Sequence, residues 1–513
     1  MFPAGPFLFA AGLFRGVFPV QDVSPPRFLL RFFWCAHTID SHQSRFQSRR
    51  RASLSSPRLT SSTNLLVPRA GARTLQFYFL HPIAMDFDVI VVGAGAAGLS
   101  AAAELQDLGL NVLVLEARDQ IGGRMDTDYQ FAPHPIERGA EFVHGENVVT
   151  WELIRKLGLH ALPAFQNDEY YYIDAAGQFL PLPQASRTSG GGTLKFISTR
   201  SGVCELAKNW ANSGKPDTDL DSLLAAGGVH LDSRFYSIVR HSFEGLDAAG
   251  LRQLGVYGLM ETSYEGDGDS DFRISEGYSS LVYHLGQQAS ILVNTPVESV
   301  KWTPSEVRLA MTTGLTLQAQ KAIITVPLTQ LQPGKIRFDP PLPQDKLNAI
   351  TRLGAGHIVK LVLRFHESFW PAKMECFATD KHTGFWWRPG WGRSDEIPVL
   401  TAYAGAGLAD RLVKFGHDAA IQIALEDLTQ LFGNRVRTTY ADGMVLNWQA
   451  ESYIEMAYSY CPVGAAGLRA VLSRPVGGVL FFAGEATSVK RSATVHGAIE
   501  SGRRVAEEVR AKL

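Results

Sequence analysis

The sequence has few cysteines, no long apolar run and almost no net charge, and each absence narrows the possible classes of protein. The four cysteines form no Cys-x-x-Cys pair, so neither a disulfide framework nor a cysteine metal site is expected. No run of 18 apolar residues occurs, which argues against a membrane-spanning helix. The formal net charge of -1 gives no reason to expect binding to nucleic acid. The isolated cysteines, which we expect to be buried thiols, are Cys35, Cys204, Cys376 and Cys461.

Residues 1–84 also lack lysine, and their only acidic residues are Asp22 and Asp40. They contain ten arginines and many serines, a composition typical of an organellar transit peptide, and they predict no packed fold. A second interpretation is that translation starts at Met85 and that the preceding stretch is an overextended reading frame. Both interpretations stay open. The rest of the chain carries 39 basic and 48 acidic residues, a balance that suits a cationic substrate.

The remaining length and its 45% apolar content are sufficient for two domains. A short apolar run over 88–92 leads into Gly93-Ala94-Gly95-Ala96-Ala97-Gly98 and then into a small-residue helix over 99–108. In this strand–turn–helix unit Gly93 permits a tight turn, Gly95 lets the backbone approach a pyrophosphate, and Gly98 lets the helix pack against the strand. The helix N-terminus then offers free N–H groups to the phosphates.

A second predicted strand over 111–115 ends in Glu116, 23 residues after Gly93. A carboxylate at this distance is where a partner of the ribose hydroxyls is expected. The two features together predict a dinucleotide-binding unit, but they do not distinguish NAD from FAD.

The segment Glu116-Ala117-Arg118-Asp119-Gln120-Ile121-Gly122-Gly123-Arg124 resembles an extension shared by flavin amine oxidases, phytoene desaturases and protoporphyrinogen oxidases. The resemblance implies that the cofactor is FAD and that the paired glycines and Arg124 pass beneath its diphosphate. Arginine suits this place because its guanidinium group binds phosphate with two parallel hydrogen bonds. The cofactor contacts implied in this segment are Glu116, Ala117, Arg118, Gly123 and Arg124.

The segment Glu137-Arg138-Gly139-Ala140-Glu141-Phe142-Val143-His144-Gly145 resembles the part of the same family that lies beside the isoalloxazine ring. It has the form found in polyamine oxidases and lysine-specific histone demethylases. The resemblance implies that Gly139, Ala140 and Glu141 contact the cofactor and that His144 lies near the substrate channel. Without the family context, a structural histidine with a hydrogen-bond partner is the simpler interpretation.

From residue 150 to about 272, helical patterns mix with strand-like pieces, which indicates a substrate domain inserted into the nucleotide fold. Gly277-Tyr278-Ser279-Ser280-Leu281 resembles the turn that returns the chain to the flavin domain. Strands are expected over 291–295, 297–302 and 321–326. By resemblance, the backbone of Val297 contacts the adenine.

Residues 354–363 alternate as in a half-buried strand, except that Lys360 stands among apolar neighbours. It resembles the lysine that holds a water molecule against flavin N5 in flavin amine oxidases. A lysine in an apolar environment tends to lose its proton, so Lys360 is a candidate for proton transfer or for flavin reoxidation. The alternative is a lysine on the solvent face of the strand.

Residues 477–487 predict a strand and a loop, and Thr494-Val495-His496-Gly497-Ala498 opens a helix that runs to Leu513. The unit resembles the C-terminal signature of flavin amine oxidases, in which the N-terminus of the last helix faces flavin N1 and the C2 carbonyl. A positive dipole end there stabilises anionic reduced flavin. The implied cofactor contacts are Gly484, Glu485, Thr494 and Val495.

Several positions specify the branch of the family. Tyr458 matches one wall of the aromatic cage at the flavin, and Thr494 occupies the second cage position, where monoamine oxidases have tyrosine. Ala457 stands where those enzymes attach the flavin through cysteine, so noncovalent FAD is expected. Trp448 matches a family tryptophan and a cofactor contact, although Glu451-Ser452 replaces the Asp-Pro that often follows it. A narrow channel of the polyamine oxidase type is favoured.

We therefore expect a Rossmann-like α/β domain over 86–150, 273–345 and 470–513, interleaved with an α+β substrate domain over 151–272 and 346–469 that contains a mixed sheet. The expected reaction is oxidation of an amine by oxygen, with Lys360, Tyr458, Thr494 and His144 at the site. An L-amino-acid oxidase or a desaturase-like flavoprotein is the alternative, and Arg240 or Arg388 could then bind a substrate carboxylate. No metal is expected. A cytoplasmic location is expected, or an organelle if residues 1–84 are a transit peptide, or a peroxisome if the terminal Ala511-Lys512-Leu513 is read as a signal.

Overall fold

The structure is a computed structural model that describes residues 86–165, 170–173, 179–181, 200–227, 233–262, 266–268 and 270–513. The two interpretations of residues 1–84 concern residues outside these ranges. Within the described ranges, no helix combines the length and the apolar character needed to cross a bilayer. Cys376 and Cys461 are buried free thiols, as expected.

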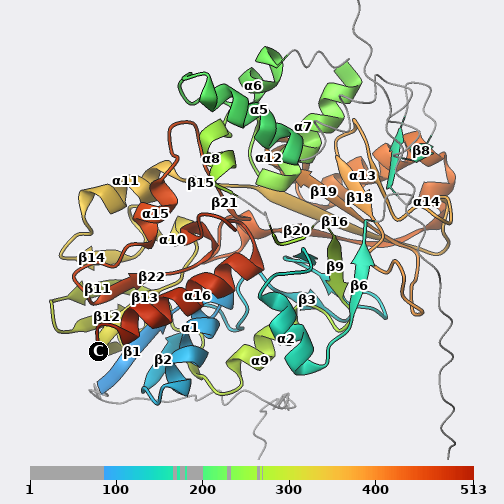
Figure 1. Ribbon diagram of the computed structural model, residues 1–513. Coiled ribbons are helices and arrows are strands. Elements are labelled where there is room, and N and C mark those ends of the chain that lie inside the picture. The colour runs from blue at the N-terminus through green and yellow to red at the C-terminus, as the bar shows by residue number, and fades with distance from the viewer. Residues whose placement is uncertain are drawn as a thin grey trace, which may run out of the picture. The chain divides into compact units, whose positions relative to one another are not determined.

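The first sheet carries the glycine turn and has eight strands, seven of them in the order β10-β2-β1-β13-β12-β11-β14 (Figure 1). Strands β10, β2, β1 and β13 run parallel, and β22 pairs in parallel with β13, whereas β13, β12 and β11 form an antiparallel meander. The strands are β1 (Asp86–Val92), β2 (Val112–Leu115), β10 (Ser290–Leu292), β11 (Val297–Trp302), β12 (Val307–Met311), β13 (Thr316–Ile324), β14 (Arg337–Asp339) and β22 (Leu480–Phe482).

Helices cover both faces of this sheet, as its apolar parallel strands require. On one face α1 (Ala96–Asp107) and α16 (Val495–Arg510) lie side by side over Val89 and Val91 of β1 (Figure 1). The alternate residues Ile90 and Val92 face a second core, which includes residues of α10 (Leu328–Leu331), α11 (Gln344–Arg352) and α15 (Leu468–Ser473). The first and last segments of the described chain thus meet in one layer.

The expected fold class, a Rossmann-like α/β domain interleaved with an α+β domain that contains a mixed sheet, is confirmed. The observed ends of strands β1, β2 and β11 and of helix α16 differ from the predicted ends by at most three residues. Strand β13 begins at Thr316, five residues before the predicted start, because its first residues pair with β12 in a hairpin. The domain boundaries themselves stay a prediction.

The second sheet has the order β20-β16-β19-β18-β17-β7-β8 and is antiparallel except for the parallel pair β17–β7. Helices α12 (Ala406–Val413), α13 (His417–Phe432) and α14 (Arg435–Thr439) pack on it (Figure 1). Its strands are β7 (Tyr170–Ile173), β8 (Phe179–Pro181), β16 (Ile358–Phe365), β17 (Cys376–Ala378), β18 (Phe385–Trp387), β19 (Val399–Gly405) and β20 (Tyr440–Asn447).

The single half-buried strand predicted over 354–363 is wrong in two respects. Residues Gly354–Ala355 form a separate strand, β15, which pairs with β21 (Ser459–Tyr460), and β16 begins only at Ile358. Every residue from Ile358 to Leu363 is buried, including Lys360, because apolar side chains cover both faces of β16. The alternative of a solvent-facing Lys360 is therefore also wrong.

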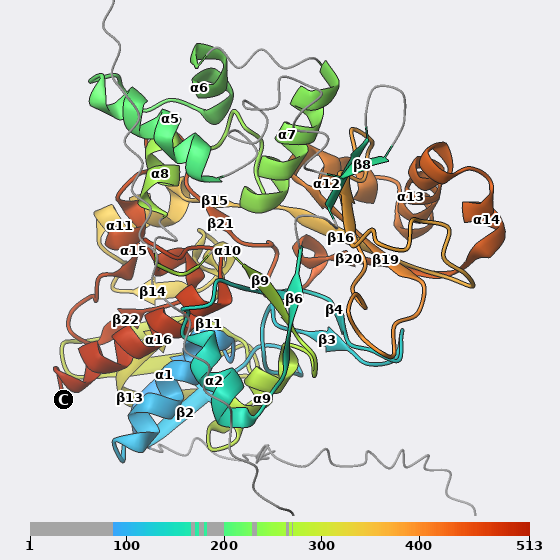
Figure 2. The same ribbon diagram turned by 45° about the vertical axis from the view of Figure 1, so that its right-hand side comes forward.

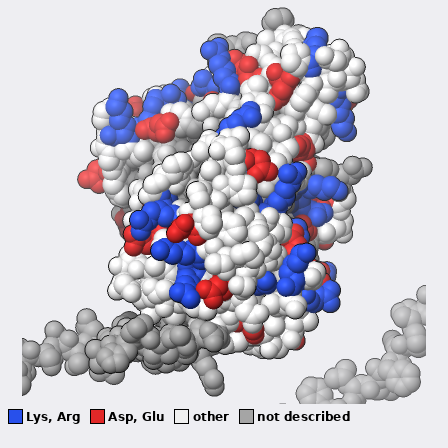
Figure 3. Space-filling model, turned by 90° about the vertical axis from the view of Figure 1, so that its left-hand side faces the viewer, with Lys and Arg blue, Asp and Glu red and all other residues white. Residues whose placement is uncertain are grey.

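Smaller elements connect the two sheets. A three-stranded sheet has the order β5-β9-β6, and Figures 1 and 2 place β6 and β9 between the larger sheets. A group of four helices packs around its own apolar cluster. The strands of the small sheet are β5 (Phe142–His144), β6 (Ala161–Ala164) and β9 (Asp271–Ile274). The four helices are α5 (Arg200–Asn212), α6 (Leu220–Ala226), α7 (Ser233–Asp247) and α8 (Val256–Glu261). The remaining short elements are β3 (Thr127–Asp128), β4 (Ile136–Glu137), α2 (Thr150–Leu157), α9 (Ser279–Gly286) and the 3-10 turns η2 (Trp448–Ala450) and η3 (Glu485–Thr487). On the face drawn in Figure 3, basic and acidic side chains are intermingled.

Candidate active site

The glycine turn between β1 and α1 leaves open space at the helix N-terminus. Gly93 has a φ of 109°, and a Cβ atom at Gly98 would lie 1.9 Å from the carbonyl oxygen of Gly93, so both positions need glycine. Within the described residues, a Cβ atom at Gly95 would meet nothing within 4 Å, and α1 has no side-chain cap and no acidic residue in its first turn. The N–H groups of this turn, which includes Ala97, therefore suit a diphosphate.

Glu116 lies buried at the end of β2, beside the same turn. One of its carboxylate oxygens accepts a hydrogen bond from the Ala94 N–H at 2.8 Å, and the other accepts one from the Arg118 N–H at 2.9 Å. Burial raises the pKa of Glu116, and these backbone hydrogen bonds lower it in part. The Glu116 carbonyl accepts a hydrogen bond from Thr295 N–H at 2.8 Å, which brings the half-buried Val297 at the start of β11 close to this corner of the site.

Trp448, which directly follows β20 of the second sheet, lies next to Arg118. Beyond Ala117, the guanidinium carbon of Arg118 lies 5.6 Å from the centre of the Trp448 ring. The Trp448 indole N–H donates to the Arg138 carbonyl at 2.9 Å, and a Cβ atom at Gly139 would lie 3.1 Å from Trp448 Cζ2. The structure thus places Arg118 and Gly139 next to Trp448, and all three were predicted separately as cofactor residues.

The segment around Arg124 packs against the glycine turn. Gly123 has a φ of 59°, and a Cβ atom there would lie 3.5 Å from the Cα atom of Gly95. The Ala140 N–H donates to the Arg124 carbonyl at 3.0 Å, and a Cβ atom at Gly139 would lie 1.9 Å from the same oxygen. Glycine at 139 is therefore required by the close approach of two backbones.

Arg124 joins the two ends of the predicted flavin site. Its guanidinium group donates to the Ala457 carbonyl at 2.6 Å and to a Glu485 carboxylate oxygen at 3.0 Å. Glu485 is buried and also accepts a hydrogen bond from the Ser459 hydroxyl at 2.6 Å. Burial would raise the pKa of Glu485, but the adjacent charges of Arg124 and Arg469 outweigh burial and hold that pKa below its usual value.

The start of α16 completes the C-terminal half. Gly484 has a φ of 120° and its N–H donates to the Ser501 hydroxyl at 2.8 Å. Thr494 caps the helix, because its hydroxyl accepts a hydrogen bond from the Gly497 N–H at 3.0 Å. Val495, the first helical residue, is half-buried, and within the described chain the first turn of α16 holds no acidic residue. An electron-rich group of a cofactor is favoured at this helix end.

Lys360 lies in β16 of the second sheet, and its ammonium group has three acceptors. It donates to the carbonyl oxygens of Glu137 at 3.1 Å and Gly139 at 2.8 Å and to a Glu141 carboxylate oxygen at 3.0 Å. An ammonium group has three N–H donors, so these bonds use all of them. The apolar environment predicted for Lys360 holds for its stem but is wrong for its head group.

Glu141 is the centre of a buried network that the sequence did not reveal. Its second oxygen accepts hydrogen bonds from the Trp387 indole N–H at 2.7 Å and from Arg273 Nε at 3.2 Å. Arg273 also donates to Glu375 at 2.7 Å, and the side chains of Glu141 and Glu375 are 4% and 0% exposed. Arg273 lies in β9, whose four residues alternate between charged and apolar side chains, so the sequence marks neither Arg273 nor Trp387.

Glu137 contributes a second buried carboxyl group next to Lys360. It accepts hydrogen bonds from the Tyr278 N–H and the Thr127 hydroxyl, both at 2.7 Å. Burial raises the pKa of Glu137 to about 8, and the two hydrogen bonds oppose this shift. The Glu137 side chain thus binds Tyr278 and Thr127, and the side-chain acceptor of the Lys360 ammonium group is Glu141.

Aromatic rings line the side of the site beyond Lys360. The Tyr458 hydroxyl donates to the Gly245 carbonyl of α7 and lies 3.1 Å from the Tyr403 hydroxyl. Tyr403 pairs with Lys360 across β16 and β19, and its ring centre lies 5.4 Å from that of Trp387. Burial raises the pKa of Tyr403 to about 12, so this hydroxyl group stays protonated and can donate. Sequence reasoning found Tyr458 but missed Tyr403.

The two arginines considered for a substrate carboxylate differ in their contacts. Arg240 lies 3.9 Å from Glu244 along α7, and its buried Nε atom has no hydrogen-bond partner among the described residues. Arg388 binds Glu396 at 2.8 Å and two backbone carbonyls. A different arginine, the buried Arg273, belongs to the Lys360 cluster through Glu141.

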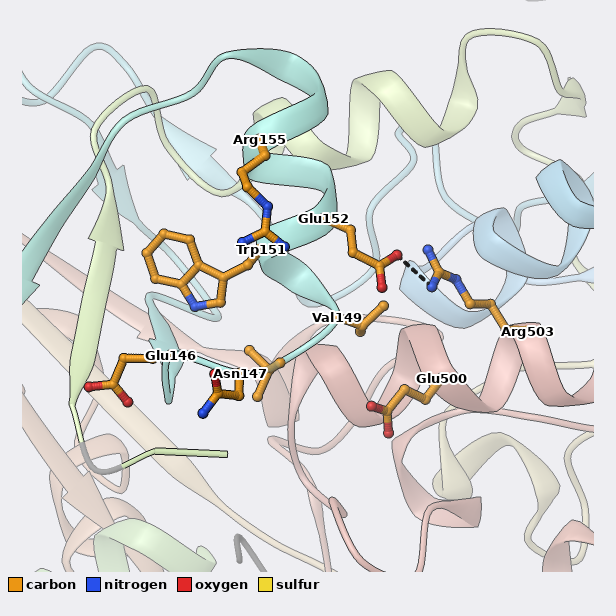
Figure 4. A pocket seen from close by; sticks show the side chains of 9 residues that line it. Glu146, Asn147, Val149, Trp151, Glu152, Arg155, Glu500 and Arg503 are labelled. Carbon is orange, nitrogen blue, oxygen red and sulfur yellow. Dashed lines mark hydrogen bonds and ion pairs between the residues drawn. The ribbon is translucent and has the colours of Figure 1, made fainter. Parts of the chain in front are cut away.

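His144 lies at the edge of this site. Its Nδ1 atom is 2.7 Å from a carboxylate oxygen of Asp271, and its side chain is 46% exposed. On the described surface nearby, a hollow of about 450 Å³ lies between α2 and α16 (Figure 4). Its polar walls include the Glu152–Arg503 ion pair but none of the predicted catalytic or cofactor residues, so we locate the site by its hydrogen-bonded groups and not by this hollow.

Comparisons with known proteins agree with this geometry. The family model of flavin containing amine oxidoreductases matches residues 96–510. The chain is 30% identical over 459 residues to polyamine oxidase 2 of Arabidopsis thaliana, covering 83% of this chain and 88% of that protein. It is 28% identical over 469 residues to lysine-specific histone demethylase 1B of Mus musculus, but this match spans 88% of the chain and only 55% of the demethylase.

Two solved structures share the fold. Putrescine oxidase bound to putrescine has a TM-score of 0.72 at 21% identity, with 84% of this chain and 100% of that chain covered. Cyclohexylamine oxidase from Brevibacterium oxydans has a TM-score of 0.70 at 25% identity, with coverage of 83% and 99%.

Proposed function

Because the chain belongs to the family of flavin-containing amine oxidoreductases, we propose that it binds FAD noncovalently and oxidises a primary or secondary amine of the polyamine type with oxygen. One observation carries the cofactor part of the proposal: Arg124 binds Glu485 at 3.0 Å and so joins the glycine-turn half to the C-terminal half. The open space at Gly95 and the uncapped end of α1 fit a diphosphate. Ala457 offers no nucleophile to attach the flavin.

The protein residues would orient the amine and manage protons, because the cofactor carries the redox chemistry. Bound FAD would accept two electrons and a proton from the carbon next to the amine nitrogen, and oxygen would take two electrons and two protons to become hydrogen peroxide. Water would then hydrolyse the imine product to a carbonyl compound and a smaller amine, or ammonia where the substrate is a primary amine. The Tyr458 ring would orient the amine, and the start of α16 would favour negative charge on the cofactor. Lys360, whose three N–H donors are bound by protein acceptors, would act on the reoxidation step through its positive charge.

The small side chain at Thr494 and the match to polyamine oxidase 2 over most of both chains support a polyamine-type substrate. A second candidate is an L-amino-acid oxidase, and one observation favours it. Among the described residues, the buried atoms Nη2 of Arg273 and Nε of Arg240 have no hydrogen-bond partner, so either arginine would be a candidate to bind a substrate carboxylate.

The test is to purify the full chain, to measure FAD released by heat, and to screen amines and amino acids for peroxide production. Peroxide from spermine, spermidine or their acetylated forms is expected. Production from L-amino acids alone, abolished by Arg273→Gln, would move the assignment to the second candidate. A protein without FAD would contradict both.

A further inference from the structure

Glu141 occupies a position that the family resemblance gave to the cofactor, but its contacts point elsewhere. Both carboxylate oxygens are used by protein donors: one by Lys360 at 3.0 Å, the other by Trp387 at 2.7 Å and Arg273 at 3.2 Å. The side chain is 4% exposed, so these partners replace water almost completely. A carboxylate in this setting is a fixed charge that orients its donors.

We infer that Glu141 is a positioning residue that holds the Lys360 ammonium group in place for its part in flavin reoxidation. The inference rests on the proposed function, because it acts through the role proposed for Lys360. The other two acceptors of Lys360 are backbone carbonyls of Glu137 and Gly139, which lie in the same segment as Glu141 but carry no net charge. Glu141 is thus the one charged side chain in hydrogen-bond contact with this lysine among the described residues.

The partners behind Glu141 explain why its carboxylate cannot turn away. The Trp387 side chain is nearly fully buried and its indole N–H points at Glu141. Arg273 is held in turn by Glu375 at 2.7 Å, and its guanidinium carbon lies 4.9 Å from the centre of the Phe142 ring. The chain of contacts therefore runs from a packed aromatic wall through Glu141 to Lys360.

The chemistry of glutamine makes Glu141→Gln a sharp test. A carboxylate accepts hydrogen bonds at both oxygens, whereas an amide accepts at one end and donates at the other. If the amide oxygen faces Lys360, the NH₂ group meets the N–H donors of Trp387 and Arg273. If it turns round, Lys360 faces a donor. In either orientation the amide side chain of the variant keeps the shape of glutamate and loses one side of the network.

The experiment measures the two half-reactions separately in the FAD-loaded enzyme by stopped-flow absorbance. E141Q is expected to slow reoxidation of the reduced flavin by oxygen about tenfold or more, because it removes a charge-assisted hydrogen bond. The rate of anaerobic reduction by the amine is expected to stay within about threefold of the wild-type rate. In a K360M background the same change is expected to have little further effect, because Glu141 then has no lysine to position.

The matched control is Glu375→Gln, which removes the other buried carboxylate on Arg273 but contacts neither Lys360 nor Trp387 in the described structure. It is expected to lower the unfolding temperature without slowing reoxidation. Equal slowing by E375Q, or an E141Q effect that is as large in K360M as in wild type, would overturn the inference.

A readout on the FAD-stripped protein separates this inference from the proposed function. E141Q leaves the buried Lys360 charge without its counter-ion, so the single variant is expected to unfold at a lower temperature than the double variant K360M/E141Q. A double variant that is less stable than E141Q would contradict the pairing, whether or not an amine substrate is found. If the pairing holds but no amine reduces the flavin, the proposed function alone fails.

Discussion

Gly95→Ala tests the cofactor site without disturbing the fold around it. Gly95 has a φ of -83°, which alanine adopts freely, and in the described structure a Cβ atom there meets nothing within 4 Å. The apo-protein should therefore keep its stability to within about 1 kcal/mol, since the small cost of alanine at a helix N-cap is offset by a less flexible unfolded chain. The added methyl group would instead occupy the space proposed for the diphosphate.

The expected loss in FAD affinity follows from the contacts that the methyl group displaces. A hydrogen bond from a backbone N–H to a charged phosphate contributes about 1.5–3 kcal/mol, so loss of one such bond weakens FAD binding by about 10- to 100-fold. The assay is titration of FAD-stripped protein with FAD, followed by flavin fluorescence. Urea unfolding of the same apo-protein measures the effect on the fold.

Gly98→Ala is the matched contrast. Its Cβ atom would lie 1.9 Å from the Gly93 carbonyl oxygen, so α1 must move by about 1 Å, a shift that costs about 1–3 kcal/mol. This variant should lose both stability and FAD affinity. The reasoning is refuted if Gly95→Ala binds FAD within about twofold of wild type, or if it destabilises the apo-protein as much as Gly98→Ala does.

Three further predictions concern other parts of the site. Arg124→Met removes one of the two cations beside the buried Glu485 carboxylate and leaves Arg469, so it should destabilise the apo-protein by about 1.5–3 kcal/mol in urea unfolding. Glu485→Ala should destabilise the Arg124→Met background less than it destabilises wild type. Tyr458→Ala should lower kcat/KM for the amine about tenfold or more while FAD titration stays unchanged, and Tyr458→Phe, which keeps the ring, should lose less than about threefold. Burial lowers the pKa of His496 to about 4, below its unfolded value of about 6.5. As the pH falls from about 6.5 to 5, the free energy of unfolding of wild type should therefore decrease by about 1–2 kcal/mol relative to that of His496→Asn. A constant difference in unfolding free energy across this range would contradict the shift.

The local parts of the fold could be predicted because they depend on neighbouring residues. The turn at Gly93 and Gly98 needs glycine for reasons that lie within six residues, and the cap at Thr494 bonds to Gly497 three residues later. Such features are visible in a short window of sequence. The start of β13 was misplaced because its first residues, 316–320, alternate between exposed and buried positions instead of forming an apolar run, and the hairpin with β12 extends the strand to them.

The interior of the site depended on contacts between distant segments. Lys360 stands out in an apolar strand, but its partner Glu141 is 219 residues away, and the Trp387–Glu141 pair spans 246 residues. No spacing rule relates such positions. The environment of Lys360 was therefore predicted from its sequence neighbours alone, and these describe the stem of the side chain and not its ammonium group.

The most direct test of the central claim is an anaerobic titration of the purified full chain with an amine, followed by admission of air. The account predicts about one heat-releasable FAD per chain, visible absorption that the amine bleaches, and recovery of that absorption in air with formation of hydrogen peroxide. A chain that carries no flavin, or a flavin that no amine bleaches, would contradict it.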